Sequence, residues 1–560
     1  MSSMHRPLLI ASVALALGCN LNGGADMLLS TQLPAGPDGA PTGPGPGFDQ
    51  QPLNCDAPTP GPMPSRRLSH VEYRYAIEDL FGRPQLASAA AAKLTADPTS
   101  LGFSNSATLL DVKPVLGQQY MEAAEAVAEG LVTDLGSVLP CNPAGAELSC
   151  ATQFIRTVGA RAYRRPLTSA EEAEFVAGYQ ALRAEFDFKT GIEWVIATVL
   201  QSPNFLYRVE LDGQGETGVR PLKGEELAQR LSFLIWHSGP DDALKAAAAE
   251  GRLSTPEDVE RETRRMLDDP RGARFLNFFL EWLDVDKLGT YAREPGVFAG
   301  LPQDIKELFR QETQAFVRHV VFEQKAGLNE LLTADYTFAN DRLAQHYGLA
   351  PVSGSQFQKV SLPAGRRGVW MQGGPLTAHD KSTRTSIVNR GIRARTALLC
   401  HNIPAPPDNV SLTLGPIDQS ASQAERLEQH RVNPTCAGCH ALIDPLGQTF
   451  EHLDAVGRLR ATDEAGRPVD TTGEVTSTRD ADGPVEDGEA LMLKLAESRQ
   501  VRACFVTQMF RYTFGREEKG FDACAQKQAM DRFEASGWDV RELVVGLVRS
   551  DAFLYREVQQ

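Results

Sequence analysis

Hydrophobic residues recur every three or four positions through most of the chain beyond residue 65, which is the period of a helix that buries one face. One such stretch follows Ser69, stops at Gly82 and places Tyr73 and Ile77 on the same face. Another opens at Thr168, where a glutamate three residues later completes a capping-box pattern. The same period predicts further helices at 118–135, 154–165, 190–210, 223–237, 255–268, 272–285, 302–323 and within 489–557.

Two regions lack this period. Residues 20–65 are rich in proline and glycine, a composition that predicts a disordered stalk. Residues 361–420 carry many Pro, Gly, Ser and Thr residues, which predicts long loops over a compact core. Strand-like segments are limited to 357–361 and 469–476. The expected fold class is therefore mainly α: a multi-helix body with a loop-rich C-terminal region, preceded by the stalk.

The N-terminus has the pattern of an export signal. His5 and Arg6 precede an apolar run from Pro7 to Leu17, and a glycine comes directly before Cys19. This order predicts a lipoprotein-type signal over 1–19 with an acylated Cys19. Cleavage at another small residue would leave Cys19 without lipid. We expect an exported protein of the periplasm or cell surface, held to a bacterial membrane by a lipid anchor.

A short motif carries the most specific chemistry in the chain. Cys436 and Cys439 are separated by two residues, and His440 follows directly. This is the spacing of a haem c attachment site, in which two thiols bind one porphyrin and the histidine binds its iron. We expect one haem c with His440 as the proximal ligand, which makes the C-terminal region cytochrome-c-like. The alternatives are a small-loop disulfide and half of a zinc site, but a zinc site needs a second pair at comparable spacing.

Six cysteines remain after the motif and Cys19 are set aside. An even number in an exported chain permits three disulfides. Cys141–Cys150 would close a small loop, Cys504–Cys524 would join two neighbouring helices, and Cys55–Cys400 would remain. Six cysteines allow fifteen pairings, so this connectivity is one hypothesis among them.

Five groups of residues have the pattern of known domains. They are 66–73 with 79–82, 154–168, 202–208 with 231–236, 366–391 with 404–407 and 436–460, and 491–556. On these residues the chain resembles, in order, a multidomain family of exported bacterial proteins built from DUF1587, DUF1595, DUF1592, DUF1588 and DUF1585. The resemblance implies export and a cytochrome-c-like site, and it implies no substrate.

The expected domain organisation follows from the signal, the composition and this resemblance. The signal occupies 1–19 and the Pro/Gly-rich linker 20–65. The five domain-like segments follow at 66–140, 150–215 (with the start of the next), 216–350, 351–460 and 489–557.

Several residues are candidates for the sixth iron ligand and for polar contacts around the motif. The resemblance favours His379 as the distal ligand. Met492 and Met509 lie at apolar helical positions, which fits core residues better, and Met371 and His430 are further candidates. We expect Asp444 to cap a turn at 443–447, which could offer a backbone carbonyl to the other ring nitrogen of His440. A nearby group of arginines predicts a solvated helix face, with contacts to haem propionates or to an acidic partner as the alternatives: Arg366, Arg367, Arg390, Arg393 and Arg395.

The net charge of −16 argues against a nucleic-acid partner. Two function classes stay open. In the first, the protein is a membrane-tethered monohaem c-type protein in electron transfer or a haem-dependent redox reaction, and so a candidate oxidoreductase, with an unidentified redox partner protein. In the second, it is a non-enzymatic ligand- or polymer-binding surface lipoprotein in which the Cys436–Cys439 pair is structural.

Overall fold

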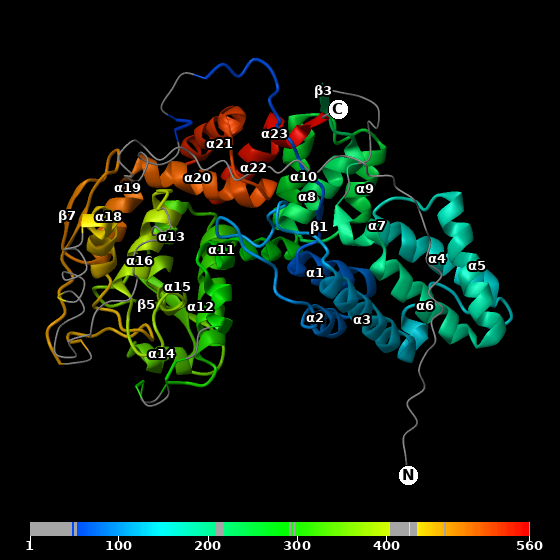
Figure 1. The fold of residues 1–560 in the computed structure, drawn as a ribbon, viewed down its shortest axis with the longest axis horizontal. Helices are drawn as coiled ribbons and strands as arrows, with labels where there is room; N and C mark the ends of the chain where they lie inside the picture. The colour runs from blue at the N-terminus through cyan, green and yellow to red at the C-terminus, as the bar shows by residue number, and fades with distance from the viewer. Residues whose placement is uncertain are drawn as a thin grey trace, which may run out of the picture. The chain divides into compact units, whose positions relative to one another are not determined.

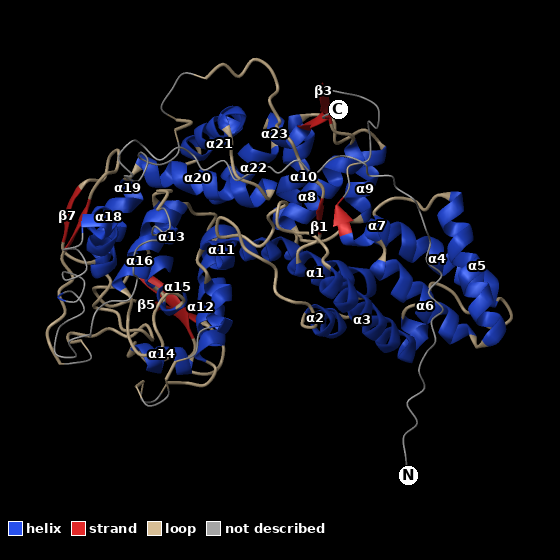
Figure 2. Cartoon of the chain, viewed as in Figure 1, coloured by secondary structure: helices blue, strands red, loops and turns tan. Residues whose placement is uncertain are grey.

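The computed structural model describes residues 47–49, 53–208, 210, 218–290, 293–294, 297–298, 301–403, 425, 434–463 and 466–558. This part of the chain is mainly helical, as predicted, and its strands form two-stranded sheets (Figure 2). None of its helices is both long and apolar enough to cross a bilayer. The predicted signal and Cys19 lie outside the described residues.

A first hydrophobic core is built by the helices that follow the N-terminal segment (Figure 1, blue to cyan). Tyr73, Phe154 and Ile196 are fully buried in it. The first and last strands of this part pair antiparallel, which brings its two ends together. Its elements are β1 (Arg66–Arg67), α1 (His70–Phe81), α2 (Pro84–Ala91), α3 (Pro114–Leu131), the 3₁₀ helix η1 (Val132–Ser137), α4 (Glu147–Tyr163), α5 (Ser169–Glu185), α6 (Phe188–Gln201), α7 (Pro203–Leu206) and β2 (Tyr207–Arg208).

A second hydrophobic core takes in most of the remaining chain. The helix after residue 223 belongs to both cores, because its Phe233 packs in the first and its Leu231 and Leu234 in the second. The elements up to residue 347 are β3 (Gly218–Pro221), α8 (Gly224–Ile235), α9 (Asp242–Ala249), α10 (Pro256–Asp268), η2 (Pro270–Phe275), α11 (Leu276–Trp282), η3 (Val285–Thr290), α12 (Ile305–Arg318), η4 (His319–Glu323), α13 (Leu328–Thr333), β4 (Tyr336–Ala339) and α14 (Asp341–Tyr347).

The C-terminal part completes the second core and returns to the start of α8. Strands β3 and β8 pair antiparallel, with Gly218 opposite Val558. The remaining elements are β5 (Gln358–Ser361), η5 (Val369–Met371), α15 (Gly373–Thr377), α16 (Ile387–Arg393), η6 (Ala394–Leu398), α18 (Pro434–Gln448), β6 (Gly473–Val475), β7 (Gly483–Val485), α19 (Gly488–Glu497), α20 (Arg499–Phe514), η7 (Gly520–Asp522), α21 (Ala523–Ala535), α22 (Val540–Val548), α23 (Asp551–Leu554) and β8 (Tyr555–Val558).

Local signals set the helix ends where the sequence predicts them. Ser69 accepts a hydrogen bond from the backbone of Glu72 and receives its side chain in return, and Gly82 ends α1 in the left-handed conformation. Thr168 caps α5 in the same way. The helix expected over 190–210 is shorter, because Ser202 caps a new helix that has Pro203 at its first position.

The expectation of long loops over 361–420 was wrong for part of that region. Helices α15 and α16 and the π-helical turn η6 lie between Gly373 and Leu398, and their residues are largely buried. Each has only five to seven residues, too few for a hydrophobic period to show in sequence. Residues 404–424 are outside the described part. The two predicted strands are found as β5 and β6.

The stalk does not extend to residue 65. Phe48 is buried in the second core, and Asp49 is 2.7 Å from Arg479. Cys55 is covalently joined to the C-terminal part of the chain, and Thr59 donates a hydrogen bond to the Phe521 carbonyl. Proline and glycine are therefore compatible here with a segment that is fixed by its few apolar, charged and cysteine side chains. Residues 20–46 are outside the described part.

Three disulfides are present, and only one has the expected partners. Cys141–Cys150 is confirmed. Cys504 bonds Cys400 and Cys524 bonds Cys55, so the predicted Cys504–Cys524 and Cys55–Cys400 pairs were wrong. Cys504 faces the buried end of η6, with 5.3 Å between its Cα and that of Cys400. Proximity in sequence was misleading because the two cysteines lie on helices that present them to different neighbours.

Candidate functional site

Helix α18 carries the Cys-x-x-Cys-His motif and is packed tightly on α16. A Cβ atom at Gly391 would lie 2.0 Å from the Ile443 carbonyl oxygen, and one at Gly447 would lie 1.8 Å from that of Ile387. Both positions therefore require glycine, since any side chain would collide with the backbone of the other helix. This close approach fixes where the motif lies relative to the core.

Two buried arginines hold the segment around α18. The Arg395 Nε donates to the Leu442 carbonyl of α18 at 2.8 Å, and its Nη1 donates to the Thr476 carbonyl after β6. Arg390 pairs with Asp380 at 2.6 Å, with both side chains at most 1% exposed, and also donates to carbonyls beyond the helix end. Burial lowers the pKa of Arg395 to about 10, which leaves it charged at neutral pH.

The arginine group was predicted as a solvated face, and that was wrong for its buried members. Arg366, Arg390 and Arg395 are at most 3% exposed. Arg366 donates to the Gly457 carbonyl and stacks on Tyr347. The remaining two are half-buried and bind carboxylates: Arg367 pairs with Glu489 and Arg393 with Asp284. These guanidinium groups bind parts of the chain itself, so their role in the structure is to position backbone.

The two motif thiols are unbonded. Cys436 and Cys439 are half-buried free cysteines, so the expected alternative of a disulfide between them is not formed. A Cβ built at Gly438 has no described atom within 4 Å, so the turn between them borders open space. In a helix, positions i, i+3 and i+4 share one face, which places both thiols and His440 together.

His440 is oriented by a buried carboxylate. Its Nδ1 lies 3.0 and 3.1 Å from the two oxygens of Asp444, whose side chain is 0% exposed. The prediction of a capped turn at 443–447 was wrong, because these residues continue α18 and put Asp444 one helical turn after the histidine. A carboxylate at Nδ1 fixes the tautomer that presents Nε2 as the ligand nitrogen, which is the usual support of a metal-bound histidine.

The candidate sixth ligands occupy defined places. His379 lies with its Nε2 3.0 Å from the Asp284 carboxylate, which Arg393 also contacts. Burial lowers the pKa of His379 below its usual value, so the imidazole is neutral at pH 7. Met371, Met492 and Met509 are fully buried, and for the last two this agrees with core positions. His430 lies outside the described residues, and His379 as distal ligand stays a prediction.

The residues of α18 fit a covalently held haem c. They supply two unbonded thiols and an imidazole on one helical face, with Gly438 exposed between the thiols and a buried carboxylate at the histidine Nδ1. In the part of the chain that the structure describes, no group of three or more His, Cys, Asp and Glu side chains is arranged to hold a metal ion by itself. The zinc alternative thus gains no second set of ligands there.

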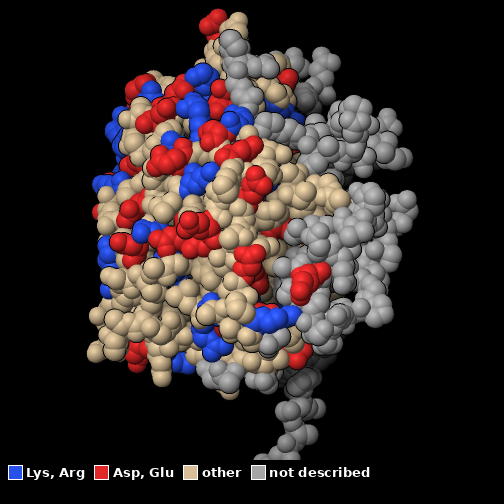
Figure 3. Space-filling view, turned by 90° about the vertical axis from the view of Figure 1, so that its left-hand side faces the viewer, with Lys and Arg blue, Asp and Glu red and all other residues tan. Residues whose placement is uncertain are grey.

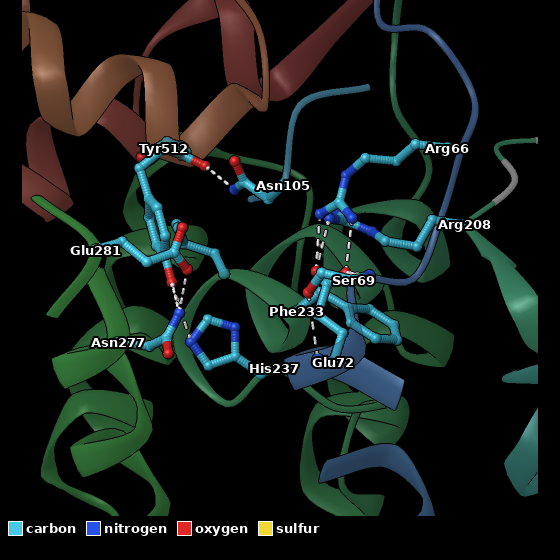
Figure 4. A pocket seen from close by; sticks show the side chains of 12 residues that line it. Arg66, Ser69, Glu72, Asn105, Arg208, Phe233, His237, Asn277, Glu281 and Tyr512 are labelled. Carbon is cyan, nitrogen blue, oxygen red and sulfur yellow. Dashed lines mark hydrogen bonds and ion pairs between the residues drawn. The ribbon is translucent and has the colours of Figure 1, made fainter. Parts of the chain in front are cut away.

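A second polar site lies where α1, α8, α11 and α20 meet, and the sequence did not suggest it. We call it the junction cavity; its volume is about 10 Å³, roughly the space of one water molecule (Figure 4). Glu281 accepts hydrogen bonds from the Ser104 backbone and the Asn277 amide. Burial raises the pKa of Glu281 to about 8, so this carboxyl is largely neutral at pH 7.

Neutral and charged groups occupy opposite sides of this cavity (Figure 4). On one side, His237 Nε2 lies 3.2 Å from the Tyr512 hydroxyl, and burial lowers the pKa of His237 to about 4. On the other, Glu72 binds both Nη atoms of Arg66 at 2.6 and 2.7 Å, and Arg208 approaches the same carboxylate at 3.5 Å. No single stretch of sequence contains these groups, which span residues 66 to 512, so pattern analysis had no local signal for them.

One face of the molecule carries charges of both signs. On the face shown in Figure 3, acidic and basic side chains are intermingled over the described residues. Such a mixture is typical of a solvated surface and does not by itself indicate a partner of one charge.

Comparisons with known proteins place five family models on the chain. Searches of curated proteins and of solved structures gave no match. The five models match residues 66–133 (DUF1587), 150–210 (DUF1595), 222–349 (DUF1592), 366–463 (DUF1588, named PSCyt3) and 482–553 (DUF1585), each described as a protein of unknown function. The motif helix lies inside the PSCyt3 match, whose name hints at a cytochrome-like domain. The chain therefore carries these five domains of unknown function in the order that its sequence predicted.

Proposed function

We propose that this protein is an exported monohaem c-type redox protein, with one haem c held by Cys436, Cys439 and His440. The observation that carries the proposal is the arrangement on α18: two unbonded thiols, and a histidine whose Nδ1 is bound by a buried carboxylate. The name of the family model that covers this helix gives independent support.

Each residue has a separate task in this proposal. The two thiols form thioethers, which hold the group covalently, and His440 binds the iron through Nε2. Asp444 keeps the imidazole oriented, and the close contacts at Gly391 and Gly447 keep α18 from shifting on the core. The haem would supply one-electron chemistry, in electron transfer to a partner protein or in a haem-dependent reaction.

Export and anchoring belong to the same proposal. Haem c is attached outside the cytoplasm, and three disulfides in one chain are typical of an oxidising compartment. The sequence pattern before Cys19 supports a lipid anchor in a bacterial membrane, facing the periplasm or the cell surface. The redox partner protein and the substrate, if the protein is an oxidoreductase, are to be identified by experiment.

Absorption spectroscopy tests the proposal on protein made with a c-type maturation system. We expect a haem absorbance that stays with the denatured polypeptide, and its loss in the double variant Cys436→Ser, Cys439→Ser. The matched control is Cys141→Ser with Cys150→Ser, which removes another closely spaced pair and should keep the absorbance. An unaltered fold without any haem signal in the wild type would favour the binding lipoprotein instead.

Carbon monoxide then distinguishes the state of the sixth position. If His379 is the distal ligand, the reduced protein binds carbon monoxide poorly. Replacement by His379→Ala would then open the position, with a shift of the Soret band on gas addition. The same spectrum in wild type and variant would rule out His379.

A further inference from the structure

A larger cavity adjoins the junction cavity and is lined by arginines from distant parts of the chain. Its volume is about 110 Å³, many times the space of one water molecule. Arg66, Arg208 and Thr513 border both cavities, and Ser65 and Arg556 border only the larger one. Strands β1, β2 and β8 and the end of α20 therefore meet around one space, which we call the arginine cavity.

The charges around this cavity do not balance. Glu72 pairs with Arg66 and Arg208. A neighbouring network joins two further glutamates to three arginines through ion pairs of 2.6 to 3.9 Å; its members are Glu210, Glu226, Arg220, Arg230 and Arg556. Glu210 also borders the larger cavity, and among the described residues the group of Glu72, Arg66 and Arg208 has one more guanidinium than carboxylates. Such a buried excess is costly unless an anion compensates it.

Arg208 has donors to spare. A guanidinium carries five N–H groups. The one hydrogen bond that the Arg208 side chain donates to a described residue is the 3.5 Å contact to Glu72. Its side chain is 19% exposed and borders the cavity, and its guanidinium lies 5.0 Å from the Phe233 ring centre. Burial, followed by the charge of Arg66, lowers the pKa of Arg208 to about 9, as expected for an under-compensated cation.

Other donors nearby lack acceptors. Arg164 is 7% exposed and packs near the same Phe233 ring, and its Nε and Nη1 are buried without a hydrogen-bond partner. The Thr513 side chain lies on the wall of both cavities, and its hydroxyl can donate a hydrogen bond. Arg164 lines neither cavity, so the donors open to a ligand there are those of Arg208 and Thr513, which suit a group that accepts hydrogen bonds.

We infer that the arginine cavity binds a small oxyanion, a carboxylate or phosphate group, through Arg208 and the Thr513 hydroxyl. The planar guanidinium fork of Arg208 matches two oxygens of such a group. The compensating charge comes from the ligand, since the described carboxylates are already shared between arginines. This site is separate from α18, and its occupation does not depend on the haem.

Calorimetric titration of the full chain tests the inference. Sodium phosphate and sodium acetate are titrated separately at constant ionic strength, with sodium chloride as the blank. We expect saturable one-to-one binding of at least one oxyanion; the comparison of the two arms tells a phosphate-type from a carboxylate-type ligand. Arg208→Gln should weaken binding by about 10-fold or more and Thr513→Val by about 2- to 10-fold, the range for charged and neutral hydrogen bonds.

The controls separate this site from general charge effects. Arg156→Gln removes an exposed arginine that pairs with Glu172 and should leave the affinity unchanged. The double variant Cys436→Ser, Cys439→Ser should bind the same anion equally well. The inference is overturned if no saturable binding of phosphate or acetate is found. It is also overturned if the wild type and Thr513→Val bind the anion with equal affinity. The threonine variant keeps every charge, so it decides the matter even if Arg208→Gln does not fold.

Discussion

Helix α18 and the junction cavity carry polar chemistry in opposite ways. On α18 the reactive groups come from five consecutive residues. The thiols are half-buried, and the buried Asp444 carboxylate orients the histidine. At the junction, the groups come from residues 66 to 513, and they are bonded in two sets that face each other across the cavity: Arg66, Glu72 and Arg208 in one, and Asn277, Glu281, Tyr512 and His237 in the other. The groups on α18 are placed to bind a molecule from outside the chain. Those at the junction are part of what holds the domains together.

This difference predicts where substitutions change stability and where they change chemistry. Truncating a junction residue leaves a buried charge or donor without its partner, which is among the most destabilising changes in proteins. Changing a motif residue on α18 removes a ligand and leaves the packing against α16 intact. The predictions below test this contrast, starting with the largest expected effect.

Removing the Arg66 guanidinium should have the largest effect on stability. Burial raises the pKa of Glu72, but the charge and hydrogen bonds of Arg66 outweigh this and hold that pKa at about 2. This carboxylate is therefore charged at neutral pH. Arg66→Met leaves this carboxylate, which is 3% exposed, with the Ser69 backbone hydrogen bond and, as its remaining ion pair, the 3.5 Å contact to Arg208. We expect a loss of about 3–5 kcal/mol in the free energy of unfolding, measured by urea denaturation. The exposed pair variant Arg156→Gln should show no measurable change, and equal behaviour of the two variants would contradict the contrast.

The Cys400–Cys504 disulfide should rank second. It closes a span of 104 residues and joins the end of η6, next to α16, to the buried Cys504 on α20. The double serine variant should lose about 2–4 kcal/mol, since the unfolded chain gains freedom. Thermal unfolding with and without reductant measures the effect, with Cys141→Ser, Cys150→Ser as a short-loop comparison that should lose less. A larger loss in the short-loop variant would contradict this ranking.

Glu281 should make stability fall as pH rises. Its pKa is raised to about 8 in the folded chain and is near 4.3 when unfolded, so between these values only the folded state holds the proton. The free energy of unfolding of the wild type should therefore decrease from pH 5 to pH 9, by on the order of 2–4 kcal/mol from this group. Glu281→Gln should remove most of that decrease. Burial also raises the pKa of Glu312 to about 7, so a smaller slope remains. A variant with the wild-type slope would show that Glu281 is ionised in the folded state.

Asp444→Asn should have the smallest effect on stability and a distinct effect on redox chemistry. The substitution removes a negative charge beside His440 and keeps a hydrogen-bond acceptor at the same place. If haem c is bound there, its reduction potential should rise by on the order of tens of millivolts, since the oxidised iron loses a stabilising charge. Potentiometric titration measures the shift. The control Asp380→Asn changes another buried carboxylate, paired with Arg390, and should affect stability more than potential.

The sequence predicted the parts of the molecule that depend on neighbours in the chain. The capped helices α1 and α5, the closely spaced Cys141–Cys150 bridge and the order of the five domains are of this kind. The Cys-x-x-Cys-His motif is equally local, and the haem c that it indicates stays a prediction.

The predictions that were wrong concern features that depend on contacts between residues distant in sequence. The partners of Cys55 and Cys400, the burial of Arg390 and Arg395, and the packing of Phe48 are set by tertiary structure. Glu226 shows the same limit: beside Glu225 it suggests a solvated face, but it is 7% exposed and lies 3.7 Å from Arg556. The junction cavity collects such residues, which is why no local pattern indicated it.

The mass of the exported polypeptide tests the central claim most directly. Intact-protein mass spectrometry of the wild type should show the mature chain plus one covalently bound haem, and fragmentation should place it on the peptide that contains Cys436 and Cys439. A wild-type mass that equals the bare polypeptide, from cells that mature a control cytochrome c in the same preparation, would contradict the account.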